Sequence, residues 1–253
     1  MAATKLPEPA GDWAFFLDVD GTLLEHAERP DAVHVDAALR KLLGALDEAA
    51  GGALALISGR SVADVDGLFA PLVLPVAGQH GIERRDARGE IHRHAFAAEP
   101  LRRAAARLGT FAAGHQGLLL EDKGHSIALH YRRAPRLEAA VKEQMAAAAS
   151  ELGEGFEVQG GKLVFELKPG GRDKGMVIEE YMAEAPFKGR TPVFAGDDLT
   201  DEYGFGVVNR LGGHSIKVGR GQSVARWRIE DAGAVRAWLA AWLARFAQQA
   251  QKH

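Results

Sequence analysis

The chain contains no cysteine among its 253 residues, so disulfides, thiolate metal sites and cysteine nucleophiles are excluded. No apolar stretch approaches the roughly 20 residues of a membrane-spanning helix, and the first residues lack the apolar segment of a secretory signal. A basic excess is also missing, since 31 Lys and Arg residues stand against 34 Asp and Glu residues, a formal net charge of −3. We therefore expect a soluble, cytoplasmic protein, monomeric, with no nucleic-acid or membrane partner.

What is present is the composition of an ordinary globular protein. Hydrophobic residues make up 47% of the chain and charged residues 26%. A chain of 253 residues is long enough for one large domain or two modest ones, each with its own apolar core.

Short apolar runs that end in polar turns alternate with helical patterns in the outer parts of the chain. Residues 14–17 and 53–57 are two such runs, and leucines with helical spacing occupy residues 35–50 between them. The rhythm returns later with a helical stretch from Lys174 and an apolar run at 192–195. This alternation predicts a doubly wound, mostly parallel α/β sheet.

The middle of the chain has a different rhythm. A hairpin pattern over residues 84–94 precedes a helical stretch and two strand-like runs, and this helix-plus-hairpin unit then occurs a second time. The pattern predicts an inserted α+β cap with an open antiparallel sheet. We place the core at residues 1–84 and 170–253 and the cap at residues 85–169. Such an insert can cover the strand ends where α/β sheets bind ligands.

The segment Asp18-Val19-Asp20-Gly21-Thr22 carries the strongest chemical signal. Side chains at positions i and i+2 of an extended strand point the same way, so Asp18 and Asp20 face one site, and Gly21 lets the chain turn sharply. This arrangement suits a carboxylate nucleophile, Asp18, beside a general acid and base, Asp20. A turn with solvated acids is the simpler alternative.

A second acidic group, Gly196-Asp197-Asp198-Leu199-Thr200-Asp201, also follows an apolar run. Because an anion that attacks a phosphate must overcome charge repulsion, we expect Mg²⁺ held by Asp18, Asp197 and the backbone carbonyl of Asp20. Either Asp198 or Asp201 then holds metal-bound water or orients a lysine. Capping of the following helix is an equally good interpretation for Asp201.

Two further groups carry weaker signals by themselves. Ser58, Gly59 and Arg60 open a helix after the second strand, where Ser58 and nearby backbone N–H groups suit a phosphate, although a plain N-cap is the simpler interpretation. Lys174 follows a glycine-rich hinge and suits neutralisation of phosphoryl charge, although a surface lysine is simpler in isolation. The ordered set of acidic pair, serine, lysine and acidic pair favours the functional interpretation.

This ordered set resembles the four motifs of the haloacid dehalogenase (HAD) superfamily of phosphotransferases. Over almost its whole length the chain further resembles trehalose-6-phosphate phosphatases, in FFLDVDGTLL, LISGRS, VAGQHGIERR, LEDKGHSIALHYR, GKLVFELKPGGRDKG and FAGDDLTDE. The resemblance implies a HAD-like core and a Mg²⁺-dependent enzyme that hydrolyses a small sugar phosphate through an aspartyl-phosphate. It also implies that Lys174 binds the phosphate and that the sugar hydroxyls meet Glu121, Lys123, Lys162 and Glu166.

The cap residues can also be interpreted from chemistry. Glu121 and Lys123 lie two apart on one predicted strand, and Lys162 and Glu166 four apart on another, so each pair shares a face. Carboxylates and ammonium groups together suit vicinal hydroxyls, whereas exposed cross-strand ion pairs, worth little, are the alternative. His80, near the junction of core and cap, is equally suited to substrate contact and to a structural role.

Other functions share parts of this pattern. Sucrose-phosphate phosphatase, mannosyl-phosphoglycerate phosphatase and phosphomannomutase are expected to share the core motifs and to differ in the cap. A non-catalytic phosphate-binding module is the alternative from another class, but such a module has no need of a second carboxylic acid beside Asp18.

Overall fold

The computed structural model of the chain describes residues 6–25, 33–94, 98–153, 155–161 and 163–250. It divides into two compact units, one formed by residues 1–92 and 173–253 and the other by residues 93–172. Each unit has its own cluster of buried apolar side chains, so each is described by itself.

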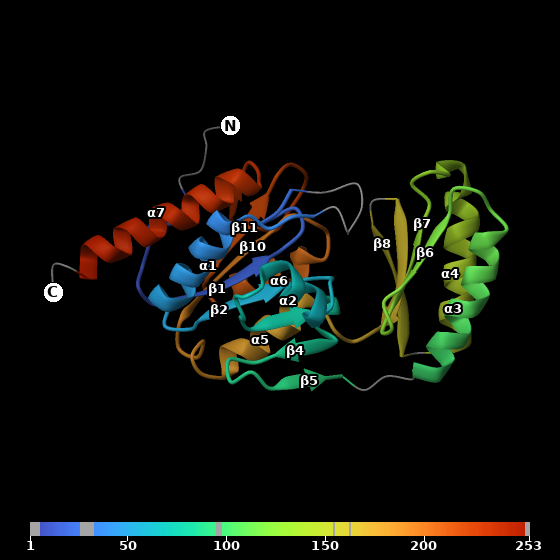
Figure 1. Cartoon of the computed structure of the whole chain (residues 1–253), viewed down its shortest axis with the longest axis horizontal. Coiled ribbons are helices and arrows are strands. Elements are labelled where there is room, and N and C mark those ends of the chain that lie inside the picture. The colour runs from blue at the N-terminus through green and yellow to red at the C-terminus, as the bar shows by residue number, and fades with distance from the viewer. Residues whose placement is uncertain (1–5, 26–32, 95–97, 154, 162, 251–253) are drawn as a thin grey trace. The chain divides into compact units, whose positions relative to one another are not determined.

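The first unit is built on an eight-stranded sheet in the order β12-β11-β10-β1-β2-β3-β4-β5 (Figure 1). Neighbouring strands from β12 to β3 pair in parallel, and β4 pairs antiparallel to β3. This sheet confirms the predicted doubly wound α/β core. The strands are β1 (Trp13–Asp18), β2 (Leu54–Ile57), β3 (Val76–Gly78), β4 (Glu83–Arg85), β5 (Ile91–Arg93), β10 (Thr191–Gly196), β11 (His214–Val218) and β12 (Trp227–Ile229).

Helices of the first unit bury an apolar stripe against this sheet. In α1, Leu39, Leu43 and Leu46 recur at helical spacing and are buried, and the Asp36 side chain caps the first turn through the Leu39 N–H. Within the described residues, no helix combines the length and hydropathy needed to cross a membrane. The helices are α1 (Ala37–Ala49), α2 (Val62–Phe69), η2 (Gln79–Gly81), α5 (Lys174–Ala183), α6 (Asp201–Arg210) and α7 (Ala232–Ala250).

The second unit is an antiparallel sheet in the order β6-β7-β9-β8 with helices packed on its apolar face. Alternate residues such as Ile127, Leu129 and Leu167 join the buried cluster of this unit. This confirms the predicted α+β insert. Its elements are α3 (Ala98–Ala113), β6 (Leu119–Asp122), β7 (Ile127–His130), η3 (Pro135–Leu137), α4 (Glu138–Leu152), β8 (Phe156–Gly161) and β9 (Val164–Pro169).

The hairpin of β4 and β5 belongs to the first unit, so the compact units divide at residue 93, whereas the sequence predicts a boundary at residue 85. Strand β4 is hydrogen-bonded to β3 in the core sheet. The two adjacent arginines of this strand, Arg84 and Arg85, are both buried. Arg85 forms a bidentate pair with Asp66 of α2, at 2.7 and 2.6 Å, and Arg84 lies over the ring of Tyr181. These contacts offset the cost of burying charge.

Candidate active site

The candidate nucleophile, Asp18, is the last residue of the central strand β1, between β2 and β10. Its side chain is buried, and Oδ1 accepts a hydrogen bond of 2.8 Å from Nζ of Lys174. Among the described residues, Oδ2 has no hydrogen-bond partner. A buried carboxylate oxygen without a donor is costly, so this atom is suited to receive a cation or a reacting group.

Lys174 begins helix α5, and its ammonium group joins two carboxylates. Nζ donates to Asp18 and, at 2.6 Å, to Oδ1 of Asp201. Burial opposes the charged form of the lysine, yet Asp18 and Asp201 hold its pKa well above the ordinary value. Lys174 therefore stays cationic.

The carboxylates around this lysine outnumber the positive charge available to them. Burial raises the pKa of Asp18 well above its usual range against the opposing effect of Lys174, and the charges of Asp201 and Asp197 raise it further. Burial likewise raises the pKa of Asp201 to about 7. The single positive charge of Lys174 thus does not neutralise these carboxylates. A further cation would favour the ionised Asp18 that a nucleophile requires.

Two aspartates in the segment between β10 and the first turn of α6, Asp198 and Asp201, have different hydrogen-bond partners. Asp201, 0% exposed, orients Lys174 through Oδ1, while its Oδ2 accepts the backbone N–H groups of Asp197 and Asp198 at 2.8 and 2.9 Å. Asp198 accepts the N–H groups of Thr200 and Asp201 at the start of α6. Thr200, the residue before α6, makes no side-chain capping hydrogen bond, and Asp198 instead holds the turn that leads into the helix.

Carboxylate oxygens of Asp18, Asp197 and Asp201 lie within 4.8 Å of one another. An all-oxygen donor set with a buried, unpaired oxygen on Asp18 fits Mg²⁺. Gly21, at φ +89°, closes this site, since a Cβ there would lie 2.3 Å from the Asp197 carboxylate. Because both Asp201 oxygens are already bonded, Asp18 and Asp197 are the carboxylates best placed to hold the ion.

Arg60, which the sequence predicts as a substrate contact, engages Asp20. The guanidinium donates from Nε and Nη2 to the two oxygens of Asp20, both at 2.7 Å. Ser58, buried just after β2, accepts the Arg60 N–H at 3.0 Å, and Gly59 lies between these two residues. The Ser58–Arg60 turn thus positions the candidate acid and base. The side chain of His80 lies outside the described residues.

The second unit gathers polar residues on the sheet face opposite its apolar cluster. Glu166 and Glu121 both register with Ala128 of β7, from either side, so they lie in one row. Glu166 accepts hydrogen bonds from Lys123 at 3.2 Å and from Ser126 at 2.6 Å. Its side chain is only 14% exposed, so this is no ordinary surface ion pair. Lys162 lies outside the described residues.

Three further polar residues, two in the second unit and one in the first, were not predicted from the sequence. His130 contacts Glu121 at 3.0 Å and lowers the pKa of that carboxyl group, and Ser126 donates to Glu166. Lys217 of β11 donates to the backbone carbonyl of Asp197. Strand periodicity was the available signal for His130, because it lies two residues from Ala128 on the same face of β7.

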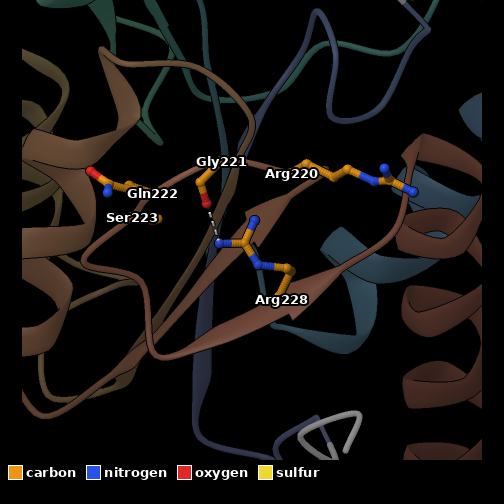
Figure 2. A pocket seen from close by; sticks show the side chains of 5 residues that line it. All are labelled: Arg220, Gly221, Gln222, Ser223 and Arg228. Carbon is orange, nitrogen blue, oxygen red and sulfur yellow. Dashed lines mark hydrogen bonds between the residues drawn. The ribbon is translucent and has the colours of Figure 1, made fainter. Parts of the chain in front are cut away.

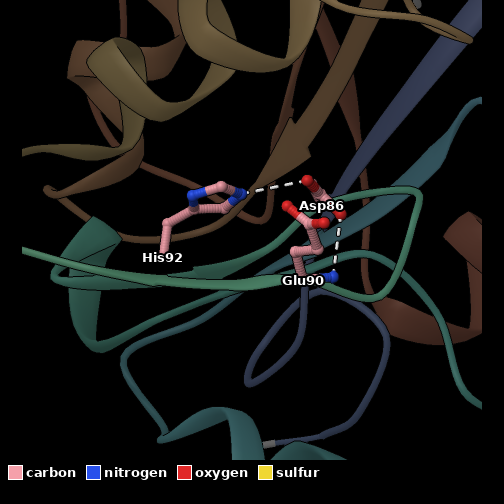
Figure 3. Close-up of side chains that lie close together, drawn as sticks. All are labelled: Asp86, Glu90 and His92. Atoms are coloured by element: carbon pink, nitrogen blue, oxygen red, sulfur yellow. Dashed lines mark hydrogen bonds and ion pairs between the residues drawn. The ribbon is translucent and has the colours of Figure 1, made fainter.

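Two other polar groups in the first unit have local structural explanations. In Figure 2, Arg228 donates to the carbonyl of Gly221 at 2.7 Å and so braces the loop after β11, next to an open hollow lined by Arg220, Gln222 and Ser223. In Figure 3, Asp86 accepts the Glu90 N–H and contacts the His92 ring, at 3.0 and 2.9 Å, at the turn of the β4–β5 hairpin.

Comparison with known proteins gives consistent matches along the chain. A family model described as trehalose-phosphatase matches residues 16–232. Over 236 residues the chain is 46% identical to the trehalose-6-phosphate phosphatase of Escherichia coli strain K12, which covers 93% of this chain and 88% of the relative. A probable trehalose-phosphate phosphatase of Sinorhizobium fredii is 43% identical over 91% of this chain and 87% of its own length.

Solved structures share this architecture. The crystal structure of a trehalose-6-phosphate phosphatase related protein superposes with a TM-score of 0.80 at 26% identity, over 93% of this chain and 99% of that one. A haloacid dehalogenase-like hydrolase from B. subtilis matches with a TM-score of 0.63 at 14% identity, over 90% of this chain and 99% of that one. The second match shows the shared fold, which extends over both compact units.

Proposed function

Since the chain belongs to the trehalose-phosphatase family, we propose that it hydrolyses trehalose 6-phosphate to trehalose and inorganic phosphate. The observation that carries this proposal is the buried group in which Lys174 joins Asp18 to Asp201 at the end of the central strand. A binding module has no need of a buried carboxylate held ready beside a second acid, whereas a covalent phosphatase needs both.

The proposed reaction has two displacements at phosphorus. In the first, an oxygen of Asp18 attacks the phosphorus, the bond to the sugar oxygen breaks, and Asp20 gives its proton to the departing alcohol. In the second, water attacks the aspartyl-phosphate and gives a proton to Asp20, which releases phosphate and restores Asp18. Both oxygens of Asp20 accept hydrogen bonds from Arg60, which orients this carboxyl group for both proton transfers.

We infer that Mg²⁺, held by Asp18 and Asp197 and by the backbone carbonyl of Asp20, neutralises charge between the carboxylate and the phosphate. Lys174 contributes a fixed positive charge that costs no reorganisation during the reaction. Ser58 and the backbone N–H group of Gly59 are proposed to hold the transferring phosphate, with Arg60 completing the substrate contacts of this turn. Asp198 and Asp201 support this site through the loop and the lysine.

The sugar is proposed to bind the polar face of the second unit. Glu121, Lys123 and Glu166 present carboxylates and an ammonium group on neighbouring strands, which suits a dense array of hydroxyls. Lys162 and His80 complete the proposed substrate contacts. The hydrogen bond between Lys123 and Glu166 compensates these two charges until sugar hydroxyls replace it.

A phosphate-release assay on a panel of sugar phosphates tests this function. The panel holds trehalose 6-phosphate, sucrose 6-phosphate, mannosyl phosphoglycerate, mannose 6-phosphate and p-nitrophenyl phosphate, each with MgCl₂. We expect kcat/KM for trehalose 6-phosphate to exceed every other value by at least about 100-fold, which two well-placed polar contacts can supply. A preference for another sugar phosphate would transfer the assignment to that substrate, and no release from any would favour a binding module.

A further inference from the structure

Lys217 is a buried cation next to the candidate metal site, and it has no role in the reaction proposed for this protein. It is the fourth residue of β11, is 6% exposed, and registers with Gly196, the residue just before Asp197. A buried lysine is uncommon unless its ammonium group is satisfied. The position of Lys217 therefore calls for an explanation.

Among the described residues, the ammonium group of Lys217 donates to two backbone carbonyls and to no carboxylate. One is the carbonyl of Asp197, and the other, at 2.8 Å, is the carbonyl of Val218. Because carbonyls carry no net charge, the positive charge of Lys217 is not cancelled by its own hydrogen bonds.

The backbone of Asp197 is consequently held on both sides. Its N–H donates to Oδ2 of Asp201 at 2.8 Å, and its carbonyl accepts from Lys217. Gly21 lies against its carboxylate so closely that a Cβ there would approach within 2.3 Å. Together these three contacts fix the backbone of Asp197 and thereby the direction in which its carboxylate points.

We propose that Lys217 is a positioning residue for the metal site, which fixes the backbone of Asp197 so that its carboxylate meets the divalent cation. This inference rests on the metal site of the proposed function and adds a residue to it. Groups that orient a metal ligand typically contribute 10- to 100-fold in metal affinity. The loss of Lys217 should therefore weaken Mg²⁺ binding by roughly that factor.

The experiment measures Mg²⁺ affinity directly, by isothermal titration of MgCl₂ into the whole, metal-stripped protein without substrate. Lys217→Met removes charge and donors at similar length, and Lys217→Gln retains a donor without the charge. Lys188→Met makes the same chemical change at an exposed lysine of the first unit and serves as the matched control. Lys217→Met should bind Mg²⁺ about 10- to 100-fold more weakly, Lys217→Gln should lose less because it keeps a donor for the Asp197 carbonyl, and the control should match the unchanged protein.

A steady-state measurement accompanies the titration. For Lys217→Met, the MgCl₂ concentration for half-maximal phosphate release should rise in parallel with the dissociation constant, whereas KM for trehalose 6-phosphate at saturating Mg²⁺ should stay within about twofold, because Lys217 positions only the metal ligand. A purely structural role would lower thermal stability and leave the Mg²⁺ affinity unchanged.

The outcomes separate this inference from the proposals it builds on. If the unchanged protein binds Mg²⁺ and both Lys217 variants bind equally well, or if neither variant folds, the positioning role is overturned. If the unchanged protein binds no Mg²⁺, the metal site and the role of Lys217 are rejected together. In a third outcome the unchanged protein binds Mg²⁺, and the Lys217 variants bind it more weakly as expected. If the unchanged protein then releases no phosphate from trehalose 6-phosphate, only the proposed substrate is rejected.

Discussion

Asp18 is placed where its reactivity depends on the charge around it. Burial raises its pKa, and Lys174 opposes that effect. The lysine must also serve Asp201, to which it lies 0.2 Å closer, at 2.6 against 2.8 Å. A shared ammonium holds the two carboxylates together without neutralising both. The group formed by Asp18, Asp201 and Lys174 therefore keeps an excess of negative charge that one more cation would neutralise.

Replacing Asp18 with asparagine tests the nucleophile. An amide keeps the size of the side chain but forms no acyl phosphate, so phosphate release should fall by roughly 10³-fold or more. The fold should remain, because Asp201 still pairs with Lys174. Circular dichroism and phosphate release measure the two properties. Near-normal turnover in a folded Asp18→Asn protein would remove Asp18 from its proposed role.

At the scale of elements, strand registry decides which polar side chains share a surface. Strands β6, β7 and β9 place Glu121, Ala128 and Glu166 in one row, although about 45 residues separate the first from the last along the chain. The helices cover the opposite, apolar face. The polar face is thereby free, within this unit, to bind a ligand.

Glu166→Ala should separate the sugar phosphate from a generic phosphate ester. A hydrogen bond to a charged group is worth about 1.5–3 kcal/mol, so kcat/KM for trehalose 6-phosphate should fall roughly 10- to 150-fold. Hydrolysis of p-nitrophenyl phosphate should change little, because no sugar is held. Glu143→Ala, at an exposed position of α4 in the same unit, is the control. Equal losses on both substrates would assign Glu166 to the fold, and no loss on either would exclude it from substrate binding.

His214 makes the stability of the first unit sensitive to acid. It begins strand β11 and so lies at the strand ends away from the candidate site. Its ring lies 5.1 Å from that of Trp13 and 4.8 Å from that of Trp227. Burial lowers the pKa of His214, Arg226 lowers it further, and Asp12 opposes them. The folded state therefore binds fewer protons than the unfolded state near the ordinary His value of about 6.5, so the contribution of His214 is lost as pH falls below that value.

His214→Phe should reduce this sensitivity. The aromatic contacts are kept, but the titrating group is gone, so the loss of stability between about pH 7.5 and pH 5.5 should be smaller than in the unchanged protein. Urea unfolding at the two pH values provides the measurement. Activity at neutral pH should stay unchanged, since His214 begins β11 and the candidate site lies at the opposite strand ends. An identical pH dependence in both proteins would exclude His214 as its source.

At the scale of the molecule, the candidate metal site couples ligand binding to folding. Asp18 and Asp197 come together only when β1 and β10 pair, because 178 residues separate them in the chain. An ion that binds the assembled site and not the unfolded chain stabilises the fold by mass action, by about 2.7 kcal/mol at 100 times its dissociation constant. The metal is therefore expected to affect stability as well as turnover.

Removal and return of the metal test this coupling. EDTA should abolish phosphate release and lower the melting temperature, and MgCl₂ should restore both. Asp18→Asn protein should show a smaller rise in melting temperature with MgCl₂, since one ligand is altered. Full activity after exhaustive chelation would contradict the metal site.

The sequence by itself determined the alternation of strands and helices, the inserted cap, and the positions of Asp18 and Asp197 directly after buried strands. These features follow from local rules, because the period of side chains along a strand or helix and the turn-forming glycines are encoded within a few residues. In parallel sheets those local rules also predict that functional residues gather at the carboxyl ends of the strands.

Only the tertiary structure decided which partners these residues have. It pairs Arg60 with Asp20, lets Asp198 hold the turn before α6, and brings Lys217 to the carbonyl of Asp197. It also added the arginine-rich strand β4 to the core sheet. Such pairings depend on which distant strand ends become neighbours and on where a charge can be compensated, and neither property is written in local periodicity.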